Sequence, residues 1–69
     1  MMKFKDVITL INAGGAFVKV MDRDNHTLYD GTDKSLNHDR VRDLMKYFGE
    51  FNVYAIEPES KDVTLVYIK

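Results

Sequence analysis

The last nineteen residues constrain the fold more than any other segment of the chain. Residues 51–69 read FNVYAIEPESKDVTLVYIK, which is two apolar β-runs joined by a Pro-Glu-Ser-Lys turn. Both runs carry apolar side chains at successive positions, whereas a strand with one solvated face alternates apolar and polar residues. This pattern predicts a β-hairpin with two faces to cover. Because a chain of 69 residues has few other elements to provide that cover, the hairpin also indicates a partner surface.

Hydrophobic spacing upstream of this hairpin predicts two helices and a second hairpin. Apolar residues from Phe4 to Ile11 keep the i, i+3, i+4, i+7 spacing of an amphipathic helix, which Gly14-Gly15 would end. Asn37 or Ser35 is placed to cap a later helix. The expected elements are a helix over 3–12, strands over 16–22 and 27–30, and a helix over 38–48.

These elements predict an α+β fold with the order α-β-β-α-β-β in a single small domain spanning residues 1–69. The simplest architecture is a four-stranded antiparallel sheet with both helices packed on one face. The side of the sheet toward the helices would hold Ala16, Val18, Val20, Leu28, Val66 and Ile68, together with either Tyr54 and Ile56 or Val53 and Ala55.

The opposite side of this sheet is the candidate interaction surface. It would expose Phe17, Met21, Tyr29, Leu65 and Tyr67. Monomers seldom leave apolar patches beyond about 300–600 Å² in solvent, and aromatic residues and Met are enriched in interface cores. We expect a homodimer or higher homo-oligomer, or a protein partner, bound through the sheet face or a free strand edge. Two alternatives remain open: the sheet closes around these residues, or the face assignment is displaced by one residue.

Charge and composition narrow the class of partner. The formal net charge of −1 argues against phosphate binding as the main task, and no segment approaches the about 18 apolar residues of a membrane span. The absence of cysteine fits a reducing, cytoplasmic setting. A small nucleic-acid-binding regulatory protein is the alternative, because Tyr29, Tyr54 and Tyr67 could stack on bases from the sheet. The element order, however, differs from the βαββαβ of the common RNA-binding sheet.

The residue pattern predicts no enzyme, no cofactor and no metal site. His26 and His38 have no second His or Cys at ligand spacing. The segment 22–26 reads DRDNH, but the sixth and twelfth positions counted from Asp22 hold neither the Gly nor the Glu of a calcium loop. Asp and Asn at this place are typical of a hairpin turn, which is the interpretation adopted here.

Two segments carry a resemblance to a known group of proteins. Residues 18–31 read VKVMDRDNHTLYDG, a strand followed by an Asp-rich turn and a Leu-Tyr-x-Gly sequence, and residues 62–68 read DVTLVYI. In this pattern the chain resembles small uncharacterised proteins of phages and prophages in Gram-positive bacteria. The resemblance implies an accessory protein, either an inhibitor of a host or defence protein or a phage regulatory factor, and it assigns no activity to any residue.

Overall fold

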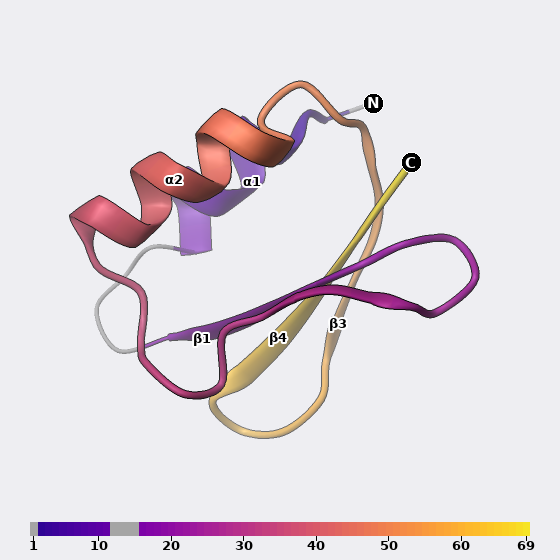
Figure 1. Cartoon of the computed structure of the whole chain (residues 1–69). Coiled ribbons are helices and arrows are strands. Elements are labelled where there is room, and N and C mark those ends of the chain that lie inside the picture. Colours follow the sequence, from indigo (N-terminus) through magenta and orange to yellow (C-terminus); the bar gives the residue numbers. More distant parts are fainter. Residues whose placement is uncertain (1, 12–15) are drawn as a thin grey trace.

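The computed structural model describes residues 2–11 and 16–69, and it confirms the α+β class and the predicted element order. Within these residues the chain forms two helices and a four-stranded sheet, whose arrangement is drawn in Figure 1. The elements are α1 (Phe4–Ile11), β1 (Phe17–Met21), β2 (Thr27–Asp30), α2 (His38–Phe48), β3 (Val53–Pro58) and β4 (Val63–Ile68). The predicted helix stop at Gly14-Gly15 lies outside the described residues.

Helix α2 begins and ends where the sequence predicts. Asn37, and not Ser35, caps it: the Asn37 Oδ1 accepts a hydrogen bond from the Arg40 backbone N–H at 2.8 Å. At the other end, the Gly49 N–H donates to the Met45 carbonyl at 2.9 Å. Because caps satisfy backbone groups that a helix leaves unpaired at its termini, these contacts fix the length of α2.

The sheet is mixed, so the prediction of a wholly antiparallel sheet is wrong in one pairing. The strand order is β2-β1-β4-β3, and the two central strands, β1 and β4, run parallel. A hairpin sets the pairing only between its own two strands. The chain leaves β2 at one edge and enters β3 at the opposite edge after passing through α2, and β4 then lies beside β1 in the same direction.

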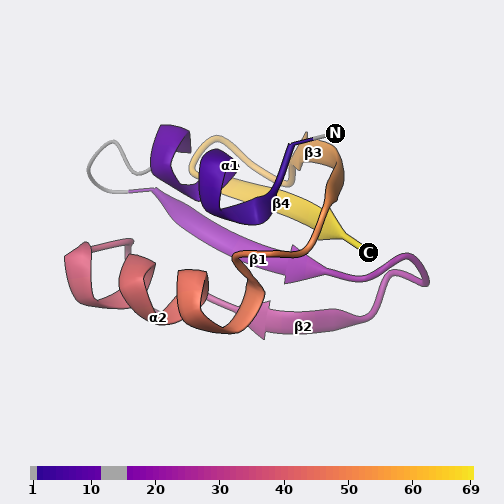
Figure 2. The same cartoon turned by 90° about the horizontal axis from the view of Figure 1, so that it is seen from above.

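One hydrophobic core joins the helices to the sheet. Its buried members are Phe4, Val7, Ile8, Val18, Val20, Leu36, Val41, Leu44, Val53, Val66 and Ile68. The Phe4 and Phe48 rings meet edge to face, with centroids 5.8 Å apart, and link α1 to α2. Figures 1 and 2 show both helices on the same side of the sheet. We call this side, which holds Val18, Val20 and Val66, the helix face, and the opposite side, which holds Phe17, Met21 and Leu65, the far face.

Each edge strand carries an irregularity that changes which residues share a face. In β2 the register with β1 moves from Val20 opposite Tyr29 to Met21 opposite Thr27, which leaves Leu28 as an extra residue. In β3 the register with β4 moves between Val53 and Ala55, which leaves Tyr54 as the extra residue. An extra residue reverses the alternation of side chains beyond it. Neither predicted register of residues 53–56 is therefore right, because Val53 and Ile56 pair on the helix face with Ile68 and Val66.

Candidate functional site

The far face brings together four of the five residues predicted as an interface. Along the parallel pair, Met21 lies opposite Tyr67, and Phe17 and Leu65 keep the same alternation on their strands. Because paired residues in a sheet point to the same side, Phe17, Met21, Leu65 and Tyr67 share the far face.

Tyr29 does not belong to this surface, and its assignment to the far face is wrong. It pairs with Val20 and packs against the core on the helix face. Without the extra residue Leu28, Tyr29 would lie opposite Lys19 on the far face, as the sequence pattern predicts. The bulge moves it by one position and so turns its side chain to the other side of the sheet.

The chain itself covers much of the far face. Met21 is only 9% exposed, and Phe17, Leu65 and Tyr67 are half-buried. The Lys19 Nζ lies 3.0 Å from the Glu59 carboxylate, and this ion pair spans β4, which lies between β1 and β3. The Tyr54 ring packs at 5.8 Å from the Tyr67 ring, and burial, followed by the nearby charge of Glu57, raises the pKa of the Tyr67 hydroxyl.

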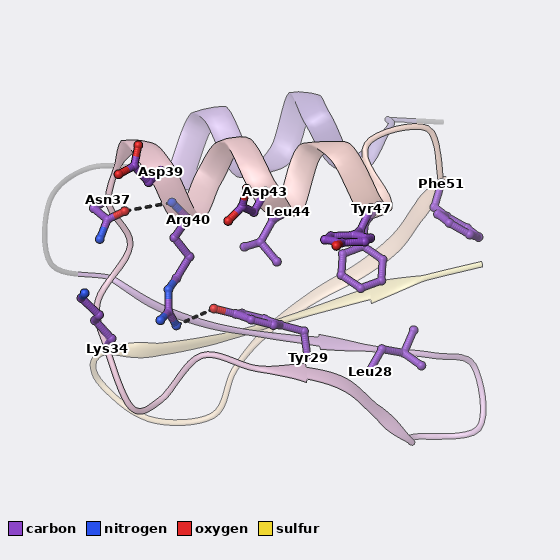
Figure 3. Close-up of a pocket in the computed structure, with 11 residues that line it drawn as sticks. Leu28, Tyr29, Lys34, Asn37, Asp39, Arg40, Asp43, Leu44, Tyr47 and Phe51 are labelled. Atoms are coloured by element: carbon purple, nitrogen blue, oxygen red, sulfur yellow. Dashed lines mark hydrogen bonds between the residues drawn. The ribbon is translucent and has the colours of Figure 1, made fainter.

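A groove with a volume of about 750 Å³ lies between α2 and the edge strand β2. Figure 3 shows the residues that line it. They are Leu28, Tyr29, Lys34, Asn37, Asp39, Arg40, Asp43, Leu44, Tyr47, Phe48 and Phe51. Sites of this size and apolar character are common places for ligands and partner segments. We call it the α2–β2 groove.

One end of the α2–β2 groove is polar and centres on Arg40. The Arg40 Nη1 donates to the Tyr29 hydroxyl at 2.6 Å and to the Asp33 carboxylate at 3.2 Å, and Figure 3 shows Arg40 reaching from α2 to Tyr29. The hydrogen bond with Asp33, followed by smaller effects of Tyr29, raises the pKa of Arg40 above its already high ordinary value. Arg40 is therefore a permanent cation, and its side chain is 23% exposed.

The wall opposite Arg40 depends on a close approach at Gly31. The Gly31 N–H donates to the Val18 carbonyl at 2.9 Å. A Cβ at Gly31 would lie 2.5 Å from that carbonyl oxygen and 2.8 Å from a carbon of the Tyr29 ring. Only glycine leaves room here for both the strand contact and the Tyr29 ring.

The other end of the groove is aromatic. Tyr47 is 70% exposed, Phe51 and Leu28 are also exposed, and the Phe48 ring centroid lies 6.5 Å from the ring centroids of both Tyr47 and Phe51. The backbone holds Phe51 in place, since its N–H donates to the Phe48 carbonyl and its carbonyl accepts from the Phe4 N–H at 2.8 Å. The three rings therefore lie together as an apolar platform at the C-terminal end of α2.

The strand that borders the groove has a free backbone edge. β2 is the outermost strand, and it pairs only with β1 in the described part of the chain. Hydrogen-bonded and non-hydrogen-bonded pairs alternate along an antiparallel ladder, and Gly31 bonds to Val18. The next pair, Asp30 with Lys19, is therefore of the second kind, and the Asp30 N–H and C=O point away from β1.

The side chain of Asp22 orders the turn between β1 and β2, as the sequence predicts for residues 22–26. The Asp22 Oδ1 accepts from the backbone N–H groups of Asp24 and His26, each at 2.9 Å. These contacts, with that from His26 the largest, lower the pKa of Asp22. Asn25 takes a left-handed conformation with φ of 64°, which Asn tolerates in turns.

Sequence reasoning named Tyr29 as an interface residue but placed no functional surface between α2 and β2. A signal for one of the groove residues exists: Tyr47 is an aromatic residue outside the apolar stripe of α2, so it has no place in the core. Phe51 carries no separate signal, because it stands at the start of the apolar hairpin segment. The Arg40–Tyr29 contact has no sequence signal, because it depends on the bulge at Leu28.

A comparison of the chain with known protein families, with curated proteins and with solved structures gives no match. The roles assigned to residues below therefore rest on geometry and chemistry alone. Within residues 2–11 and 16–69, neither helix has the length and apolar character needed to cross a membrane.

Proposed function

We propose that this protein is a non-enzymatic interaction protein that binds an extended segment of another protein in the α2–β2 groove. The segment adds to the free edge of β2 and places an apolar side chain between the rings at the aromatic end. Adding a strand to a sheet edge supplies affinity through backbone hydrogen bonds, and pockets for alternate side chains supply specificity.

The observation that carries the proposal is that a free strand edge and an open aromatic surface lie side by side. Asp30 offers an outward N–H and C=O, and Leu28 on the same strand lines the groove opposite Tyr47 and Phe51. Tyrosine and other large aromatic residues are the usual anchors of protein interfaces. The far face offers less exposed apolar surface to a partner, because its residues are buried or half-buried.

Selection from a random peptide library on the full chain tests the proposal. We expect enriched peptides whose affinity falls at least tenfold on the variant Tyr47→Ala. Leu10→Ala is the matched control, since Leu10 is 72% exposed but lies on α1 outside the groove, and it should leave affinity within twofold. Equal losses in both variants, or no enriched peptide, would overturn the proposal.

Self-association is a second candidate, and the same free edge favours it. β2 of one copy can pair with β2 of a second copy about a two-fold axis, which joins two sheets into one. Sedimentation at micromolar concentration should then show a dimer that a selected peptide dissociates, because both need the edge of β2. A monomer at every concentration would contradict self-association and leave segment binding standing.

The cellular setting proposed from the sequence is the cytoplasm, on the strength of the cysteine-free composition. A role as an accessory factor of a phage rests on the resemblance of residues 18–31 and 62–68. Both proposals are compatible with a protein that acts by binding to another protein.

A further inference from the structure

The guanidinium of Arg40 is held in one orientation with part of its hydrogen-bonding capacity unused. Nη1 donates to both the Tyr29 hydroxyl and the Asp33 carboxylate, which accounts for both of its hydrogens. A guanidinium has five N–H donors in a planar fork. The described side chains provide no partner for the other three, which belong to Nε and Nη2.

The edge formed by Nε and Nη2 matches a carboxylate. Two parallel N–H donors bind the two oxygens of a carboxylate together, and such charge-assisted pairs are stronger than neutral hydrogen bonds. Lys34 lines the same end of the groove and adds a second positive charge. The carboxylates of Asp39 and Asp33 are already paired, Asp39 with Arg42 at 2.8 Å and Asp33 with the Nη1 of Arg40 at 3.2 Å.

The same end of the groove is blocked along the direction of β2. Residues 31–37 join β2 to α2, so they cross from one wall of the groove to the other, and Lys34 and Asn37 of this segment line it. Figure 3 shows Lys34, Asn37 and Arg40 at this end, and Tyr47 and Phe51 at the other. An extended chain that lies in the groove and follows β2 toward Arg40 meets the 31–37 segment, so a chain terminus fits this end better than a continuing chain.

We propose that the α2–β2 groove captures the C-terminal carboxylate of a partner protein on the Nε–Nη2 edge of Arg40. The inference rests on the proposed function and specifies its partner. The partner's chain runs parallel to β2, with its terminus at the blocked end. The distance from Arg40 to Tyr47 along α2 is about 10 Å, at 1.5 Å per residue. An extended chain covers this in about three residues, so a large apolar side chain sits about three residues before the terminus.

Asp43 favours a terminal carboxylate over an acidic side chain in the middle of the bound segment. It lies on the α2 wall between Arg40 and Tyr47 and lines the groove. A carboxylate at the middle of a bound segment is repelled by Asp43, whereas a terminal carboxylate lies beyond it, beside Arg40. The partner's last residues before the terminus are therefore neutral or apolar.

Peptides selected from a library with free C-termini, synthesised as the free acid and as the C-terminal amide, test this inference on the full chain. Amidation should weaken binding at least tenfold. Arg40→Gln should weaken the free acid by a similar factor and the amide within twofold. Arg23→Gln is the control, since Arg23 is an exposed arginine in the turn between β1 and β2, outside the groove, and it should leave both affinities unchanged.

A milder variant guards against loss of the fold. Tyr29→Phe removes only the hydroxyl that holds Arg40, so it should weaken the free acid severalfold and the amide within twofold. Equal binding of acid and amide would overturn capture of the terminus and leave segment binding standing. Equal losses of acid and amide on Arg40→Gln would also overturn it, because Arg40 would then act through the shape of the groove. If no peptide is selected, the proposed function itself fails.

Discussion

The far face and the α2–β2 groove are both lined by large apolar side chains, but the chain covers only the first of them. On the far face, Met21 is 9% exposed, and the ion pair between Lys19 and Glu59 spans the central strand β4. In the groove, Tyr47 is 70% exposed, and the contacts that Arg40 makes with Tyr29 and Asp33 lie at the polar end, away from the aromatic rings. The groove is therefore the surface that has most to gain from a partner.

The difference shows how a small domain protects one apolar surface with its own polar residues. A lysine side chain carries a long aliphatic stem, which can lie along apolar neighbours while its ammonium group reaches a carboxylate. Lys19 is paired with Leu65 and reaches Glu59, and the hydrogen bond with Glu59 raises the pKa of Lys19. In the groove, by contrast, Arg40 is held at one end and leaves the aromatic end open.

The largest expected effect is that of Gly31→Ala, which breaks the wall of the groove. The added Cβ would overlap the Val18 carbonyl oxygen and the Tyr29 ring, so β1 and β2 would have to separate. We expect a loss of about 1–3 kcal/mol in the free energy of unfolding. We also expect loss of peptide binding, because Tyr29 no longer positions Arg40. Urea denaturation and anisotropy titration measure the two effects, and a variant as stable as the parent would contradict this account of Gly31.

Substitution of one leucine on each surface distinguishes the far face from the groove as the binding surface. Leu65→Ala removes a half-buried side chain from the far face and should cost about 1–2 kcal/mol, less than the 2–5 of a fully buried leucine. Leu28→Ala removes a side chain that is 47% exposed and should cost under about 0.5 kcal/mol. Peptide affinity should fall more in Leu28→Ala than in Leu65→Ala. If Leu65→Ala weakened binding more than Leu28→Ala, the far face would be the contact surface.

Sequence patterns predicted what depends on neighbours along the chain. The spacing from Phe4 to Ile11 and the cap at Asn37 are local, and both helices were predicted within one residue of their ends where the structure describes them. The parallel pairing of β1 with β4 depends on how the two hairpins pack in the tertiary structure, and no local sequence pattern predicts it.

The candidate site escaped prediction for the same reason. A single extra residue, Leu28, moved Tyr29 from the far face to the helix face and so created the contact with Arg40. Alternation in the sequence cannot show such an insertion, because each strand keeps its apolar residues in either register. The cover of the far face by Lys19 likewise depends on Glu59, forty residues later in the chain.

Removing the cap of α2 should have an intermediate effect on stability. The cap orders the first turn of α2, which forms the helical wall of the groove. Asn37→Ala deletes the acceptor of the Arg40 backbone N–H and should cost about 1 kcal/mol. It should also weaken peptide binding severalfold, since Arg40 lies in the first turn. Ser35→Ala is the control and should change stability by less than about 0.5 kcal/mol. Equal effects of the two variants would show that the cap does not order this wall.

The smallest effect expected is on the acid side of the pH profile. Contacts from His26 lower the pKa of Asp22 below its ordinary 3.8, contacts from Thr32 do the same for Asp30, and Lys5 lowers that of Glu50 below 4.5. A carboxyl with a lowered pKa stabilises the fold above its ordinary pKa, and the contribution is lost as the pH falls through its folded value. The midpoint temperature of unfolding should therefore fall as the pH is lowered from about 5 to about 3, and it should fall less steeply for Asp22→Asn. Parallel curves for the two proteins would contradict the role of Asp22.

Hydrogen exchange of backbone amides in the presence of a selected peptide tests whether the partner segment adds to the edge of β2. The Asp30 N–H points away from β1, so a segment added to β2 should protect it strongly, while the Tyr29 N–H, already paired within the sheet, serves as the internal reference. We expect new protection at Asp30 together with resonance shifts at Tyr47 and Phe51. Unchanged exchange at Asp30 with shifts at Phe17 and Leu65 would place the partner on the far face and contradict it.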